Sequence, residues 1–229
     1  MATSTVENYL KQLYLEQRDR PGELVPMGRL AAAMRVAPGT ATAMVKGLAE
    51  TGQVEHQPRR GVRLTPSGER LALEVLRRHR LIELFLVKVL GLDWSVVHEE
   101  ADTLEHALSA RVLERIDALL GHPSVDPHGD PIPTHQGQVA ELRRISLADC
   151  PVGVPLRIAR VLDQDPAFLQ FLERQQLIPG ARVTVVQREA AADAVRLWIR
   201  GRRKVSLGLA AAAKLLVNPP TLARRAREE

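Results

Sequence analysis

The stretch Pro38-Gly-Thr-Ala-Thr-Ala-Met-Val-Lys-Gly-Leu48 decides the fold of the first part of the chain. Pro38 suits the first position of a helix, because its missing N–H would have no partner there. An apolar stripe at helical spacing follows, formed by Ala41, Met44, Val45 and Leu48. The opposite side is small, polar and basic, with Gly39, Thr40, Thr42, Ala43 and Lys46. The pattern therefore predicts a helix that buries one face and presents a low-relief face to a partner.

Two further helices are predicted before this one. Residues 4–17 carry the stripe Val6, Leu10, Leu13 and Tyr14, and residues 27–34 form a short helix that ends near Val36. A short helix, a tight turn and a helix with a flat exposed face make a helix-turn-helix, whose second helix can enter the major groove of DNA.

A basic hairpin follows these helices. The sequence predicts a β-wing, in which Val54-Glu55-His56 pairs with Val62-Arg63-Leu64 across a turn at Pro58-Arg59-Arg60-Gly61. Three helices and such a wing describe a winged helix. Its candidate DNA contacts are Pro38, Thr40, Thr42, Ala43, Lys46, Arg59, Arg60 and Arg63. A winged helix that serves only protein contacts remains the alternative.

Six groups that can bind a divalent cation lie in two predicted helices. His79 and Glu83 stand one helical turn apart, and the next helix, capped by Ser95, presents His98, Asp102, Glu105 and His106 on one face. Ordinary buried faces do not hold so many ionisable groups. A metal site is predicted if the helices touch; solvated His–Glu pairs are the alternative reading.

Composition restricts the possible classes of protein. The chain has 229 residues, 45% of them hydrophobic, and carries a net charge of +5. No run approaches the roughly 18 apolar residues of a membrane span, so a cytoplasmic protein without a membrane partner is expected. The single cysteine, Cys150, excludes an internal disulfide and is expected to be a packing residue. Basic clusters at 59–63, 77–80, 200–204 and 224–227 suit phosphate backbones.

The rest of the chain contains three segments with different sequence patterns. Apolar residues exceed what one buried stripe needs, which predicts a subunit interface: Leu84, Phe85, Val87, Val89, Leu104, Leu108, Val112, Leu113 and Ile116. Residues 122–138 are rich in proline and glycine and should form an ordered connection in which loop packing is favoured for His122, His128 and His135. From Cys150 short alternating runs predict a barrel of about five strands with one helix near 166–175, a turn at Gly201 and a frayed basic end.

The order of these parts, and several local motifs, resemble the diphtheria toxin repressor and manganese transport regulator family. The motifs are Val6-Glu-Asn-Tyr-Leu10, the 38–46 stretch, Leu64-Thr-Pro-Ser-Gly68, Arg78-His-Arg-Leu-Ile-Glu83, Val97-His-Glu-Glu-Ala-Asp-Thr-Leu-Glu-His106, and Gly121-His-Pro through Pro127-His-Gly-Asp-Pro-Ile-Pro133. The resemblance implies a mainly α fold with small β parts. Its domains would be a winged helix-turn-helix over 1–65, a helical dimerisation and metal-binding domain over 66–138, a tether over 139–149, and an SH3-like, ferrous-transport-A-like barrel with a basic tail over 150–229.

The resemblance also implies two metal ions per subunit. One would be held by Asp102, Glu105 and His106 with Glu7 or Asn8 from the N-terminal helix, and the other by His79, Glu83 and His98, with Asp163 or Asp165 as candidates from the barrel. Asp102 stands where iron-type members have a cysteine, and Asn8 where they have a methionine, so oxygen replaces sulfur. That favours Mn²⁺, with Fe²⁺ next. Lys11 stands where manganese-type members offer a second carboxylate.

The function implied is that of a metal-dependent repressor that acts as a homodimer on a palindromic double-stranded DNA operator and controls metal homeostasis. No catalytic residue and no small-molecule substrate are expected. A metal-indifferent winged-helix dimer and a dinuclear metallohydrolase remain the alternatives at this point.

Overall fold

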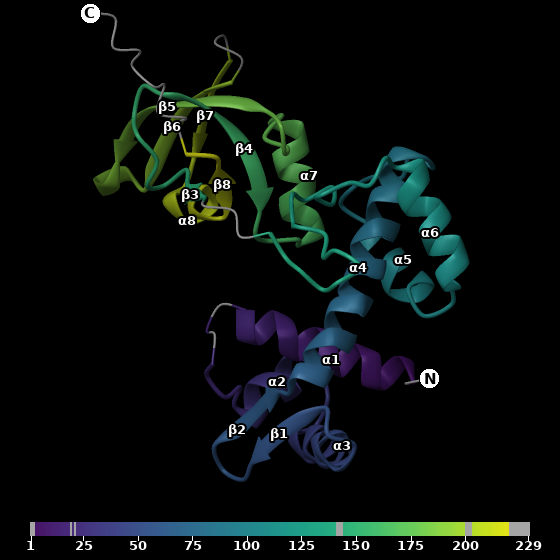
Figure 1. The fold of residues 1–229 in the computed structure, drawn as a ribbon. Helices are drawn as coiled ribbons and strands as arrows, with labels where there is room; N and C mark the ends of the chain where they lie inside the picture. Colours follow the sequence, from purple (N-terminus) through teal and green to yellow (C-terminus); the bar gives the residue numbers. More distant parts are fainter. Residues whose placement is uncertain (1–2, 19, 21, 141–143, 200–202, 220–229) are drawn as a thin grey trace, which may run out of the picture. The chain divides into compact units, whose positions relative to one another are not determined.

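The structure, a computed structural model, describes residues 3–18, 20, 22–140, 144–199 and 203–219. Figure 1 shows the helices and strands of the chain, which divides into two compact units, each made of several stretches of sequence. The first comprises Met1–Ile82, Ala101–Ser124 and Ile132–Val139, and the second comprises Glu83–Glu100, Val125–Pro131 and Ala140–Glu229. Two helices, α4 (Pro66–Lys88) and α5 (Val97–Leu104), contribute residues to both units.

The first unit begins with the predicted winged helix. It consists of α1 (Ser4–Arg18), α2 (Met27–Ala33), α3 (Pro38–Glu50), β1 (Val54–Gln57) and β2 (Gly61–Leu64). Proline stands in the first turn of α3 as predicted, and the hairpin pairs Val54 with Leu64 and Gln57 with Gly61. Apolar residues of all three helices and of both strands share one core, which includes Leu10, Leu13, Leu30, Val45 and Val62. Burying these side chains stabilises the unit by about 1.5–3 kcal/mol each.

The wing is larger than the sequence predicts. Val25 forms a bridge with Val62, with backbone N–O distances of 2.8 and 3.0 Å in the two directions. A single bridged residue leaves no alternation for a sequence pattern to show. The bridge holds the start of α2 against the outer strand of the hairpin.

Helix α5 is shorter than predicted. It ends at Leu104, so Glu105 and His106 lie in the turn that follows. The N–H groups of Ala107 and Leu108 both bond to the carbonyl of Leu104, at 3.0 and 3.1 Å, which tightens the last turn. Ser109 then caps α6 (Ala110–Leu119) by accepting a bond from the N–H of Val112. In the turn before α5, Asp93 Oδ1 accepts a bond from the N–H of Ser95 at 2.7 Å.

The predicted apolar surface is only partly exposed. Leu84 and Ile116 are each 7% exposed and belong to the interior, whereas Val89 and Val112 are exposed. Helical spacing alone does not distinguish a buried stripe from a second apolar face when neighbouring helices cover both. None of the helices in the described part of the chain combines the length and apolar character of a membrane span.

The second unit contains a six-stranded antiparallel sheet in the order β3-β8-β4-β5-β6-β7, one strand more than the barrel expected from the sequence. Its elements are β3 (Ile145–Ser146), β4 (Pro155–Val161), α7 (Pro166–Arg174), β5 (Arg182–Glu189), a 3₁₀ turn η1 (Ala190–Ala192), β6 (Ala194–Ile199), β7 (Arg203–Leu207), α8 (Leu209–Ala213) and β8 (Leu215–Val217). The strands β3 and β8 are too short to show alternation, and β3 lies in the segment expected to be a tether.

Cys150 is fully buried in the core of this unit, as predicted for a packing residue, and burial raises the pKa of its thiol. The turn predicted at Gly201 and the basic end from residue 220 onward lie outside the described residues.

Gly68 marks the close approach of α4 to the hairpin. The Thr65 hydroxyl accepts a bond from the N–H of Gly68 at 3.2 Å, and the N–H of Thr65 bonds to the carbonyl of Gln53 at 3.0 Å. A Cβ at position 68 would overlap that carbonyl oxygen. In α3, by contrast, a Cβ on Gly47 would meet nothing within 4 Å.

We expect Gly68→Ala to lower the free energy of unfolding by about 1–3 kcal/mol, because the helix must shift away from the hairpin. Gly47→Ala is the matched control, and the better helix propensity of alanine should raise stability by up to about 1 kcal/mol. Urea unfolding followed by circular dichroism measures both. Equal midpoints for the two variants would contradict the close packing at Gly68.

Candidate metal centres and nucleic-acid interface

Glu105 is the centre of a buried polar cluster in the first unit. Its side chain has no exposed surface, and its two oxygens meet Lys11 Nζ at 2.6 Å and His79 Nδ1 at 2.7 Å. Asp102 Oδ1 also lies 2.8 Å from Lys11 Nζ and 3.3 Å from His79 Nδ1. These four residues, Lys11, His79, Asp102 and Glu105, are called the Lys11 cluster below.

A second set of contacts joins α1 to the same region. Glu7 accepts from Arg78 at 2.9 Å and contacts His106 Nδ1 at 2.7 Å, while Asn8 Oδ1 lies 2.9 Å from His106 Nε2. Burial raises the pKa of Glu7, but the hydrogen bonds from Arg78 and His106 outweigh it, so the pKa lies below the ordinary value. Both ring nitrogens of His106 therefore have oxygen partners on α1.

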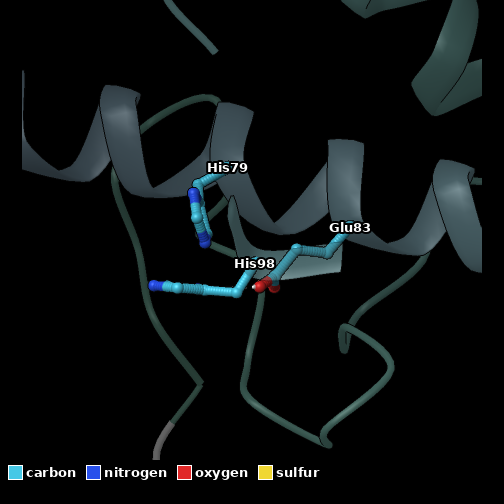
Figure 2. A group of neighbouring side chains, drawn as sticks. All are labelled: His79, Glu83 and His98. Atoms are coloured by element: carbon cyan, nitrogen blue, oxygen red, sulfur yellow. Dashed lines mark hydrogen bonds and ion pairs between the residues drawn. The ribbon is translucent and has the colours of Figure 1, made fainter. Parts of the chain in front are cut away.

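The second unit holds a different cluster around Glu83, whose side chain is buried. Glu83 Oε1 lies 3.2 Å from His98 Nδ1, and Glu83 Oε2 lies 3.9 Å from His128 Nδ1. Figure 2 shows Glu83 and His98 side by side, with His79 one turn earlier on α4. Glu83, Asp126 and His128 each offer a donor atom within 4.8 Å of the others. Glu83, His98, Asp126 and His128 are called the Glu83 cluster below.

His128 is held in one orientation. Its Nε2 lies 2.9 Å from the backbone carbonyl of Trp94, and its ring stacks on the Trp94 ring with centroids 5.5 Å apart. A carbonyl can only accept, so Nε2 carries the proton and Nδ1 presents a lone pair. Nδ1 is buried and has no hydrogen-bond partner among the described residues. That arrangement is typical of a metal-binding imidazole, whose other nitrogen is fixed by a backbone carbonyl.

The connection around His128 is also fixed by its backbone. Asp126 Oδ1 accepts from the N–H groups of His128 and Asp130, at 2.8 and 2.9 Å. Gly129 has a φ of +85°, and a Cβ there would overlap the carbonyl of Ala159 on β4. The turn is therefore built to hold His128 and Asp126 beside Glu83.

The two clusters differ in whether they suit a divalent cation. The Glu83 cluster offers two carboxylates and two imidazoles, one of which aims a lone pair inward, and this set suits Mn²⁺, Fe²⁺ or Zn²⁺. His79, Asp102 and Glu105 also present donor atoms within 4.8 Å of one another. However, Lys11 Nζ already lies within 3.4 Å of all three side chains. The Lys11 cluster therefore does not suit a cation while the ammonium is present.

The candidate ligands on α5 and after it do not act as one group. His98 contacts Glu83 in the second unit, whereas Asp102, Glu105 and His106 contact α1 and His79 in the first. Asp163 and Asp165 have other partners: Asp163 binds Lys214 at 2.6 Å, and Asp165 caps α7 at the N–H of Phe168. The bond from Lys214 is the main reason that the pKa of Asp163 is lowered.

The sequence analysis did not single out Asp126 and favoured loop packing for His128, and the structure brings donor atoms of both within 4.8 Å of Glu83. Of the three histidines in that connection, His122 and His135 instead meet Asp117, at 2.9 and 3.8 Å. A signal was present in Asp126-Pro-His128, two donor residues two apart, but irregular backbone gives no period by which to judge which side chains turn inward.

The candidate DNA contacts lie on α3 and on the wing. Pro38, Thr40, Ala43 and Lys46 are exposed, whereas Thr42 is half-buried and bonds its hydroxyl to the Pro38 carbonyl at 2.8 Å. Arg59 and Arg60 are exposed at the tip of the hairpin. Arg63 instead pairs with Glu55 on the neighbouring strand, with Nε 2.7 Å from Oε2. Arg59 and Arg60 are thus better placed than Arg63 to contact phosphates.

Models of known protein families match three consecutive parts of the chain. Residues 1–62 match the N-terminal DNA binding domain of iron dependent repressors, residues 65–134 match their metal binding and dimerisation domain, and residues 145–219 match the FeoA domain. The fold class expected from the sequence, a winged helix followed by a helical domain and a small SH3-like β domain, is therefore confirmed.

Whole-length relatives agree with these matches. The iron-dependent repressor IdeR of Mycobacterium tuberculosis is 30% identical over 215 residues, which cover 89% of this chain and 92% of that protein. The diphtheria toxin repressor of Corynebacterium efficiens is 36% identical over 197 residues, covering 81% and 84%. A solved manganese-dependent transcriptional repressor in complex with manganese is 39% identical, with a TM-score of 0.83 over 93% of this chain and 99% of that chain. The chain therefore belongs, as its motifs predict, to the family of metal-dependent, DNA-binding transcriptional repressors that includes the iron-dependent and diphtheria toxin repressors, a family that does not consist of enzymes.

Proposed function

We propose that the protein is a homodimeric repressor that binds a palindromic DNA operator in response to Mn²⁺, with Fe²⁺ as the next candidate, and so controls metal homeostasis in the cytoplasm. The observation that carries this proposal is the Glu83 cluster, a buried set of oxygen and nitrogen donors in a chain that also has an exposed recognition helix and a basic wing. Neither feature alone would connect metal supply with DNA binding.

Glu83, His98, Asp126 and His128 would hold the ion, and His79 stands one turn before Glu83 on α4. The charge of a divalent cation would offset that of the two buried carboxylates. The same ion would be a shared partner for side chains of α4, α5 and the 122–138 connection. Carboxylate oxygens and the absence of a thiolate favour Mn²⁺ over softer ions. The sequence predicts two ions per subunit, and this cluster accounts for one of them.

Continuous helices connect the residues of the Glu83 cluster to the unit that contains the winged helix. Glu83 lies on α4 and His98 on α5, and both helices also contribute residues to the first unit, which contains the winged helix. Drawing Glu83 and His98 together restrains α4 and α5. Such restraint would favour one placement of the winged helix, and the expected coupling between metal and DNA is about 1–3 kcal/mol.

A homodimer fits both the surface of α6 and the target. Val112 and Leu119, seven residues apart on α6, are 44% and 65% exposed. Apolar side chains on one face of a helix are typical of a subunit interface. Two copies of α3 related by a twofold axis would read two half-sites about 34 Å apart, which is why a palindromic operator is proposed.

We expect Mn²⁺ to tighten operator binding about 5- to 150-fold in the wild type, and His128→Ala to abolish that response without weakening metal-free binding. Fluorescence anisotropy at fixed ionic strength, on an operator selected from random DNA in the presence of Mn²⁺, measures both. His122→Ala, which removes a histidine of the same connection outside the cluster, is the matched control. Equal affinity with and without Mn²⁺ in the wild type would instead support a metal-indifferent winged-helix dimer.

Lys46→Ala and Arg60→Ala should weaken DNA binding similarly on all sequences, because both side chains are exposed cations placed for phosphates. Each should also lower the slope of log affinity against log salt by roughly one. Lys204→Ala, which removes an exposed cation on β7, should change neither quantity. An unchanged slope for both variants would remove α3 and the wing from the interface.

A further inference from the structure

We infer that the ammonium group of Lys11 takes the place of a metal ion in the Lys11 cluster, so that each subunit holds one regulatory ion, at the Glu83 cluster. The inference rests on the proposed function only for the ion at the Glu83 cluster. It revises the expectation of two ions, and it makes the attachment of α1 to α5 independent of metal.

The ammonium occupies the place that an ion would need. The Lys11 ammonium donates to Glu105 Oε1 at 2.6 Å and to Asp102 Oδ1 at 2.8 Å, and its Nζ lies 3.4 Å from His79 Nδ1. Metal–oxygen bonds are about 2.0–2.6 Å long, so a cation bound by the same two carboxylates would overlap the ammonium. The two positive charges are alternatives at one position.

Burial makes this competition severe. The side chain of Glu105 is 0% exposed and that of Lys11 is 10% exposed, so water screens neither charge well. An ion that displaced Lys11 would leave an ammonium without its partners close to a second cation. Breaking a buried ion pair is strongly unfavourable, and an ion would have to recover that free energy from its new ligands.

The positive side chains of this region are already paired with its carboxylates. Glu7, the nearby carboxylate on α1, is paired with Arg78 and with His106. Arg78 donates in addition to the carbonyl of Glu105 at 3.2 Å. Two permanent cations, Lys11 and Arg78, therefore face the three carboxylates of this region. His106, the imidazole expected to bind the ion, has both ring nitrogens directed at oxygens of Glu7 and Asn8.

The consequence for regulation follows from the position of these residues on α1. Glu7, Asn8 and Lys11 lie within one turn of that helix, on the side that meets Arg78, Asp102 and His106. The protein's own charges thus fix α1, the first helix of the winged helix, to the turn after α5. Only the Glu83 cluster is then left to respond to metal supply.

The test counts Mn²⁺ bound to the full-length protein by equilibrium dialysis and elemental analysis. The wild type should bind one ion per subunit, and Lys11→Glu, which replaces the ammonium by a carboxylate, should bind two. Glu83→Gln should bind none, while the double variant Lys11→Glu with Glu83→Gln should bind one. Lys204→Glu makes the same change of charge on β7 and should bind one ion, like the wild type.

A second variant keeps the inference testable if Lys11→Glu does not fold. Glu105→Gln in the wild-type background should lower the unfolding temperature yet still bind one ion, because no ion depends on Glu105. Loss of an ion in Glu105→Gln, or a wild type that binds two ions, would overturn the inference and leave the proposed function intact. A wild type that binds none would defeat the proposed metal response, while a gain of one ion in Lys11→Glu would still support the role of Lys11.

Discussion

Glu105 imposes the constraint on which the first unit depends. A carboxylate with no exposed surface must be paired, because an unpaired buried charge costs several kcal/mol. Its partners are Lys11 from α1 at 2.6 Å, His79 from α4 at 2.7 Å and the neighbouring His106 at 3.3 Å. Helices α1 and α4 and the turn after α5 cannot separate without exposing or orphaning these charges. The winged helix is therefore attached to the following helices by polar contacts in addition to its shared apolar core.

Helix α4 connects two kinds of chemistry within one turn. His79 donates to Glu105 in a cluster that already contains its own cation, whereas Glu83, four residues later, belongs to a cluster that contains the inward-directed lone pair of His128. Residues four apart lie on one face of a helix, so any displacement of Glu83 along that face also acts on His79. One helix therefore carries a residue of the Lys11 cluster and a residue of the Glu83 cluster, the proposed ion site.

The sequence predicted the elements better than it predicted the clusters. The apolar stripe from Ala41 to Leu48 and the turn at Arg59 and Arg60 identified the winged helix, because those patterns are local. The two predicted ligand sets differ in outcome: His79, Glu83 and His98 do present donor atoms within 4.8 Å of one another, whereas Asp102 and Glu105 lie against the ammonium of Lys11. The orientation of His128 depends on its contacts with the ring and the carbonyl of Trp94, which no periodicity in the sequence encodes.

The choice of ion now rests on different residues. In the sequence, the oxygen of Asp102 in place of a sulfur favoured Mn²⁺, but Asp102 binds an ammonium at 2.8 Å, and a lysine has no preference between manganese and iron. If Lys11 excludes an ion from its cluster, as we infer, any preference between the two ions comes from the ligands proposed for the Glu83 cluster, which include the carboxylates of Glu83 and Asp126. Two imidazoles in the same proposed set suit Fe²⁺ as well as Mn²⁺, which is why Fe²⁺ is the next candidate.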